Sequence, residues 1–179
     1  MDKSRLIKVG LIISVMINLI LFESNYYHRE AKLAHLEEVY NGINYSYEFG
    51  EILYEKFTDL TLDEKVGYLS SMHWSLTVSK WTLEDIQPND RKYIDFISLL
   101  NIYIHIPTEL EGMIRQNKNE DEVLILLETW LKDINDIKEK LSNNPLSKMN
   151  NKELEKFLKS LQLQYPSDSV ELYKQLLDR

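Results

Sequence analysis

The sequence has 179 residues, of which 44% are hydrophobic and 28% are charged, as is typical of one folded domain rather than a disordered chain. Its formal net charge of −8 argues against direct binding to nucleic acid. Because the chain contains no cysteine, disulfides, a thiolate nucleophile, cysteine-ligated zinc and iron–sulfur clusters are excluded.

The first element is an apolar run over residues 6–22 that is interrupted only by Lys8. A hydrocarbon core of about 30 Å needs roughly 20 apolar residues, with a lower limit near 17, so the run spans a bilayer if Lys8 extends to the headgroups. Lys3, Arg5 and Lys8 all lie on its N-terminal side, and the positive-inside rule then places the N-terminus in the cytoplasm. The pattern predicts a single-pass transmembrane helix that serves as a signal anchor.

A cleaved signal peptide and a buried helix of a soluble protein are the alternatives to an anchor. Cleavage requires small residues at the end of the run, whereas Phe22 and Glu23 stand there, so an uncleaved anchor is favoured. We therefore expect residues 1–5 to be a short cytoplasmic tail and residues 23–179 to be an extracytoplasmic domain at the cell membrane. From Glu23 onward the chain has 18 basic and 28 acidic residues, a net charge of −10.

Gly10, Ser14 and Asn18 recur every four residues and share one face of the predicted anchor. Small residues and an amide favour close helix contact in lipid, so this face is a candidate membrane-helix interface; chance is the equal alternative. Tyr26 and Tyr27 follow the run and fit an aromatic belt at headgroup depth.

The next segment alternates spacings of three and four, which predicts a long amphipathic helix with a coiled-coil-like seam. The predicted seam consists of Leu33, Leu36, Tyr40, Ile43, Tyr47, Gly50, Tyr54 and Phe57. A second helix should begin after Thr61, whose hydroxyl and the Glu64 carboxylate form a capping-box pattern, and should end near Ile86.

A third helix is expected over residues 90–117, although residues 93–106 are rich in β-branched and aromatic side chains and fit a buried strand as well. Pro107 should break or kink this helix unless it opens a new one, because proline cannot donate a backbone amide.

The fourth helix should begin at Glu120 and bury one stripe, with charged residues such as Asp133 lying between its members. The stripe consists of Val123, Leu127, Trp130, Ile134, Ile137 and Leu141. Two shorter helices should follow, at about 151–164 and 168–178, the first capped by Asn150. The sequence thus predicts an all-α protein, with a transmembrane helix followed by an antiparallel four-helix bundle and a C-terminal helical hairpin.

No sequence motif indicates a catalytic residue, a metal site or a cofactor. Single histidines such as His73 and His105 lack partners at metal-ligand spacing, so ordinary hydrogen-bonded histidines are expected. An aromatic pocket between helices is a further candidate, and its residues would be His73, Trp74, Trp81 and Trp130.

These observations favour a membrane-tethered helical interaction protein: an accessory subunit, inhibitor, immunity-type protein or scaffold that acts on a protein partner at the outer face of the membrane. The alternative is an extracytoplasmic ligand-binding module that uses the aromatic pocket, and an enzyme is the third possibility. The chain is also expected to be able to form a homo-oligomer.

Overall fold

The computed structural model describes the backbone of residues 3–86 and 91–177, and the side chains of Tyr26 and of residues 29–86 and 91–177. Within these residues the protein is all-helical, with six α-helices and no strand. The chain forms two compact units, residues 1–34 and residues 35–179. The second unit contains the bundle described below.

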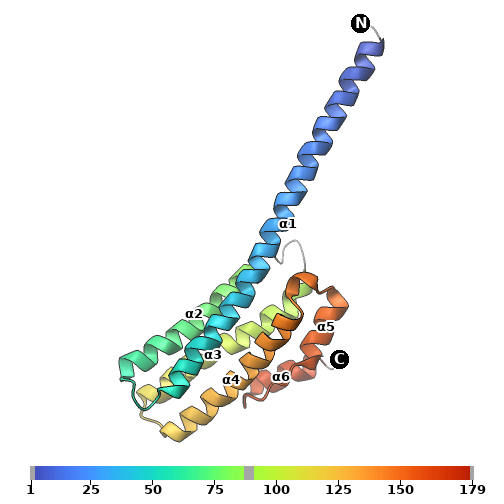
Figure 1. Ribbon diagram of the computed structural model, residues 1–179. Coiled ribbons are helices and arrows are strands. Elements are labelled where there is room, and N and C mark those ends of the chain that lie inside the picture. The colour runs from blue at the N-terminus through green and yellow to red at the C-terminus, as the bar shows by residue number, and fades with distance from the viewer. Residues whose placement is uncertain (1–2, 87–90, 178–179) are drawn as a thin grey trace. The chain divides into compact units, whose positions relative to one another are not determined.

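The helices are α1 (Lys3–Glu55), α2 (Leu62–Ile86), α3 (Ile94–Arg115), α4 (Glu120–Asn143), α5 (Asn151–Ser160) and α6 (Asp168–Leu177), and the 3-10 turns η2 (Arg91–Tyr93) and η3 (Leu146–Lys148) precede α3 and α5. In the second unit, residues 35–55 of α1 form a helical bundle with α2, α3 and α4, whose successive members run in opposite directions (Figure 1). The two short helices α5 and α6 pack against α3, where Phe96 and Phe157 meet edge to face at 5.8 Å. The predicted helical bundle is confirmed.

The predicted capping box at Thr61 is present, and the predicted cap Asn150 forms a capping box with Glu153. The Thr61 amide donates to Glu64 Oε2 at 2.8 Å, and the Asn150 amide donates to Glu153 Oε2 at 2.7 Å. The reciprocal bonds run from the Glu64 and Glu153 amides to the Thr61 hydroxyl and the Asn150 side chain. These bonds satisfy amides that have no partner inside the helix, so α2 and α5 begin where the sequence predicts.

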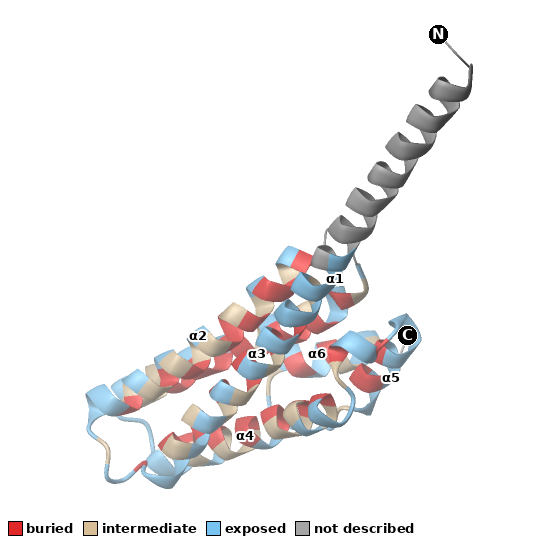
Figure 2. Ribbon diagram, turned by 45° about the horizontal axis from the view of Figure 1, so that its top comes forward, coloured by how far each residue is buried: buried red, intermediate tan, exposed pale blue. Residues whose placement is uncertain are grey.

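The buried stripe of α1 differs from the predicted seam at every second position. Figure 2 shows buried residues along the inward faces of the bundle helices, and on α1 these are Leu36, Val39, Gly42, Ile43, Ser46, Gly50 and Leu53, followed by Phe57. The prediction also placed Leu33, Tyr40, Tyr47 and Tyr54 there. Leu33 and Tyr54 are exposed, and Tyr40 and Tyr47 are half-buried. Smaller residues, one position earlier, face the neighbouring helices. The four predicted positions Leu36, Ile43, Gly50 and Phe57 are confirmed.

Small residues allow α1 and α2 to approach closely. A Cβ atom added at Gly42 would lie 2.1 Å from Ser79 Oγ and 2.7 Å from the Ser75 carbonyl oxygen. The Ser79 hydroxyl donates to the Val39 carbonyl at 2.9 Å, and Ser46 donates to the Met72 carbonyl at 2.8 Å. Both serines are fully buried and hydrogen-bonded, so the polar atoms in this contact are satisfied.

Pro107 does not break α3, which is helical from Ile94 to Arg115 and therefore includes most of the segment that also fitted a strand. A proline leaves the carbonyl four residues earlier without its helical donor, and that carbonyl belongs to Tyr103. The buried Trp130 indole donates to this oxygen at 3.5 Å. The neighbouring Ile104 carbonyl lies 2.9 Å from His73 Nδ1. A side chain of α4 thus contacts the carbonyl that proline leaves free, and a side chain of α2 contacts the carbonyl next to it.

All six residues of the predicted α4 stripe are buried, but Asp133 is buried as well and is not one of the surface charges between them. Its Oδ1 accepts the Gln164 amide and its Oδ2 accepts the Tyr165 amide, both at 2.8 Å, while the Tyr103 hydroxyl donates to Oδ2 at 2.5 Å. Asp136 similarly accepts the Gln162 amide at 2.9 Å. These bonds hold the segment between α5 and α6 in a non-helical conformation, which explains why α5 ends at Ser160 and not near residue 164.

No helix among the residues with described side chains is long and apolar enough to cross a membrane. The predicted anchor over residues 6–22 lies outside that set, as does the candidate interface Gly10, Ser14 and Asn18. Its backbone is part of α1.

Candidate interaction face

The middle of α2 has no formal charge in an otherwise highly charged chain. Residues 66–79 include no Asp, Glu, Lys or Arg over 14 positions. Some of these residues are in the core, but Gly67, Ser70 and Trp74 are exposed, and so is Trp81 just beyond the stretch. We call the surface formed by these four exposed residues the tryptophan face.

Trp74 and Trp81 are seven residues apart, so they lie two turns apart on one side of α2. Their rings meet edge to face, with centroids 5.3 Å apart and an interplanar angle of 87°. Trp74 is 56% exposed and Trp81 is 48% exposed. Tryptophan is the residue most enriched at the energetic centres of protein interfaces, where a large apolar ring becomes buried. The pair is therefore the strongest apolar anchor on the described surface of α2.

Gly67 extends this face without any requirement from packing within the domain. A Cβ atom added there would meet no atom within 4 Å, in contrast to Gly42. Glycine in a helix interior is less favourable than alanine by roughly 0.5–1 kcal/mol, so its presence here has no benefit inside the bundle. A glycine on the surface does leave room for another backbone to approach.

A hollow of about 370 Å³ lies beside Trp74, between α2 and α3, and is lined by Leu69, Ser70, His73, Trp74, Thr108 and Glu111. Two of its polar side chains, His73 and Glu111, already have partners. His73 Nδ1 lies 2.9 Å from the Ile104 carbonyl oxygen, and Glu111 accepts from Arg115 Nε at 2.7 Å. The hollow can extend the tryptophan face toward α3 by accepting a small side chain from a binding partner.

The structure does not bring the four predicted pocket residues together. His73 and Trp74 line the hollow. Trp81 does not line it, because it lies two helical turns further along α2. Trp130 is fully buried in the core, where it supports the backbone of α3. Since His73 contacts the same stretch of α3, both residues have a structural role next to Pro107.

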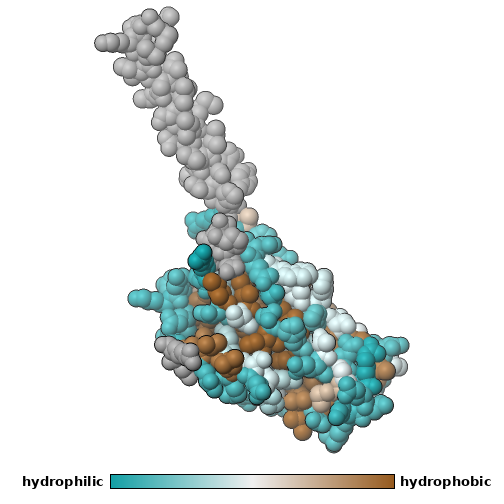
Figure 3. Space-filling view, turned by 180° about the vertical axis from the view of Figure 1, so that it is seen from behind, coloured by the Kyte–Doolittle hydropathy of each residue, from teal (hydrophilic) through white to brown (hydrophobic). Residues whose placement is uncertain are grey.

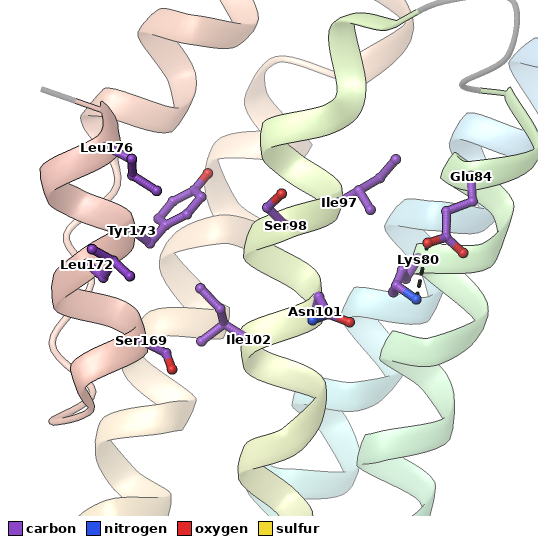
Figure 4. Close-up of a pocket in the computed structure, with 10 residues that line it drawn as sticks. All are labelled: Lys80, Glu84, Ile97, Ser98, Asn101, Ile102, Ser169, Leu172, Tyr173 and Leu176. Atoms are coloured by element: carbon purple, nitrogen blue, oxygen red, sulfur yellow. Dashed lines mark ion pairs between the residues drawn. The ribbon is translucent and has the colours of Figure 1, made fainter. Parts of the chain in front are cut away.

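A second hollow, which was not predicted from the sequence, lies between α2, α3 and α6 and has a volume of about 500 Å³. Figure 4 shows the ten residues that line it, including Lys80 and Glu84 from α2 and Leu172 and Leu176 from α6. In the sequence, only the spacing of four between Leu172 and Leu176 indicates the apolar wall of this hollow. A ten-residue helix has too few turns for such a pattern to show which side faces the core.

Two groups in the core, Asp133 and Tyr103, have raised pKa values. Burial raises the pKa of Asp133 above its ordinary value of 3.8, and its three hydrogen bonds offset this only in part. Burial and the Asp133 carboxylate together raise the pKa of Tyr103 far above its ordinary value. The hydrogen bonds of Asp133 and Tyr103 hold the fold together. The pair is therefore a structural contact between α3, α4 and the segment before α6.

Among the described side chains, no group of three or more His, Asp and Glu residues could hold a metal ion. His105 is exposed on α3 and His73 is engaged with the α3 backbone, so neither belongs to such a group.

Comparisons with protein families, with characterised proteins and with solved structures find no match to this chain.

Proposed function

We propose that this chain is a membrane-tethered interaction protein that binds a protein partner at the outer face of the membrane through the tryptophan face. An accessory subunit, an inhibitor, an immunity-type protein and a scaffold all belong to this class. The observation that carries the proposal is the exposed Trp74–Trp81 pair on an uncharged stretch of α2, within a chain of net charge −8.

The composition of the tryptophan face supports a protein partner. The centres of protein interfaces are depleted in charged residues and enriched in aromatic ones. Charged residues of both signs flank the stretch on α2. Lys65 and Lys80 lie directly beside it and are paired with Glu120 and Glu84, and Asp63, Glu64 and Asp85 lie further out. This pattern of an apolar centre and a charged rim fits a helix or loop that presents apolar side chains.

The tether is proposed from the apolar run of residues 6–22 and the cations before it. A tether confines the domain to a thin layer beside the membrane, and this raises its effective concentration toward partners in the same membrane. A moderate interface on α2 is then sufficient for function.

The test is site-specific photo-crosslinking of the full chain in its native membrane. A photoreactive residue at Ser70, beside Trp74, should yield one adduct with a different protein. In the same background, Trp74→Ala with Trp81→Ala should reduce that adduct by about tenfold or more, as expected when two interface anchors are removed. The matched control is Ile125→Ala, which removes an apolar side chain that is 62% exposed on α4 and should leave the adduct unchanged.

If the double tryptophan variant forms the same adduct with undiminished yield, or if the photoreactive residue captures only a second copy of this chain, the proposal is wrong. Circular dichroism of the double variant should match the native spectrum, because both rings are at the surface.

Ligand binding between the helices is the second candidate function and has less support. The hollow beside Trp74 contributes His73 and one indole ring, but Trp130 fills the core and cannot line it. A ligand would therefore contact one indole ring there and not the three that the expected aromatic pocket contains.

A further inference from the structure

A face formed by α2, α3 and α6 combines an apolar ridge with a hollow beside it. Leu172 and Leu176 lie four residues apart on α6 and are 58% and 54% exposed, so they form a ridge along that helix. The hollow of about 500 Å³ lies between this ridge and the residues Ile97 and Ile102 of α3 (Figure 4). Figure 3 shows hydrophobic atoms gathered in the middle of the side of the bundle opposite to that in Figure 1. We call the ridge and the hollow together the α6 groove.

The α6 groove is electrically neutral. Its lining contains one cation and one anion, Lys80 and Glu84, and these form an ion pair with 3.1 Å between Nζ and Oε1. The other lining residues are uncharged: Ile97, Ser98, Asn101, Ile102, Ser169, Leu172, Tyr173 and Leu176. In a chain of net charge −8, this is a surface across which two acidic molecules can meet without opposed like charges.

The shape of the groove favours a second copy of the same chain over a different partner. A twofold-symmetric interface uses the same patch on both molecules, so the patch must offer both a projecting and a receiving part. The leucine ridge and the adjacent hollow meet this requirement. A basic partner would be attracted to the acidic parts of the surface and gains nothing from a neutral groove.

We infer that two copies of this chain associate through their α6 grooves, with the leucine ridge of each copy in the hollow of the other. The inference rests on the proposed function in one respect, because the tether keeps both copies in one membrane and so compensates for a small interface. The surface is separate from the tryptophan face, which remains available for the different partner.

The absence of cysteine allows a direct experiment on the full chain in its native membrane. Single variants Leu172→Cys and Leu176→Cys are oxidised under mild conditions, and the disulfide-linked dimer is measured on a non-reducing gel. Each should form the dimer in roughly tenfold greater yield than the control Ile125→Cys, which is equally exposed but lies on α4. Equal yields from all three positions would reflect random collision in the membrane and would overturn the inference.

A second measurement uses the purified full chain in mild detergent. Leu172→Lys with Leu176→Lys places charges at the proposed interface and should weaken dimer formation about 100-fold or more in sedimentation experiments. The control Ile125→Lys should leave the dimer intact, and all spectra should remain helical. A native chain that sediments only as a monomer at high concentration, or a double variant that still dimerises, contradicts the inference.

The two proposals fail separately. Loss of the Ser70 adduct with persistent cross-linking at Leu172 removes the protein partner and leaves the dimer. A Ser70 adduct with no cross-link at either leucine supports the protein partner and contradicts the dimer.

Discussion

At the scale of single residues, the buried carboxylate of Asp133 organises the C-terminal third of the domain. It accepts the backbone amides of the adjacent residues Gln164 and Tyr165 and the phenol of Tyr103, so it joins two segments that are each distant from it in the sequence. Backbone amides outside a helix need such acceptors when they are buried, because an unpaired buried donor costs roughly 1–3 kcal/mol. Asp133 therefore replaces the hydrogen bonds that a longer α5 would have made internally.

Asp133→Asn should destabilise the fold by roughly 1–3 kcal/mol. The substitution replaces one of the two accepting oxygens by an NH2 donor, which would then face the donors that the oxygen had accepted from. The free energy of unfolding is measured with denaturant on the full chain in mild detergent. Ile125→Ala at the surface is the control and should change the stability by less than about 0.5 kcal/mol.

The cost of Asp133→Asn should also depend on pH, and its direction follows from the raised pKa of Asp133. A carboxyl group that binds its proton more tightly in the folded state contributes stability below its unfolded pKa and loses it as the pH rises through the folded pKa. The difference in unfolding free energy between native protein and variant should therefore shrink as the pH rises from about 3.8 through the folded pKa. A difference that grows with pH over this window would show that hydrogen bonding to the carboxylate outweighs its burial.

At the scale of elements, α1 and α2 use glycine for two different purposes. Gly42 is enclosed by Ser75 and Ser79 at distances that leave no space for a methyl group, whereas Gly67 faces open space. The same residue type is therefore required for packing on α1 and is dispensable for packing on α2.

Gly42→Ala should destabilise the bundle by about 1–3 kcal/mol through overpacking against the Ser75 backbone. Gly67→Ala should instead stabilise it by roughly 0.5–1 kcal/mol, because alanine is the better helix former where space is free. Thermal unfolding followed by circular dichroism distinguishes the two. Changes of equal sign in the two variants would contradict the close approach of α1 and α2.

The sequence predicted most helices because their periodicity, capping boxes and prolines are local signals. It placed half of the α1 stripe one position late, since tyrosines count as apolar in a pattern while small residues such as Ser46 look polar. Ser46 is buried because it finds the Met72 carbonyl on α2, and Asp133 is buried because distant amides surround it. Such partners depend on tertiary contacts that no local pattern contains. The exposed tryptophans were identified as candidates, but their separation from Trp130 also required the fold.

At the scale of the whole molecule, acidic charge dominates the composition while two described surfaces lack net charge. The tryptophan face lies on α2, and the α6 groove has no residue in common with it, although Lys80 and Glu84 of the groove also belong to α2. A molecule with two neutral surfaces can associate with itself and with another protein at the same time, while its net charge limits nonspecific association.

The proposed topology predicts the result of protease treatment. Protease added outside intact cells should digest residues 23–179 and leave residues 1–5 protected with the membrane segment. Tags at both ends, followed by immunoblotting, give the measurement, and permeabilised cells are the control. A mature form that begins near Ser24 and appears in the medium would instead establish a cleaved signal peptide.

The positions of the three tryptophans make it possible to follow binding at the surface and opening of the core separately by fluorescence. Trp130 is fully buried in the core beside Tyr103, while Trp74 and Trp81 are in contact with solvent and with each other. The near-ultraviolet emission of the outer pair therefore responds to anything that covers α2, and that of the inner ring responds only when the bundle opens. With Trp130→Phe or with both outer rings replaced, occupancy of the surface and integrity of the core become two independent fluorescence signals from one unlabelled chain.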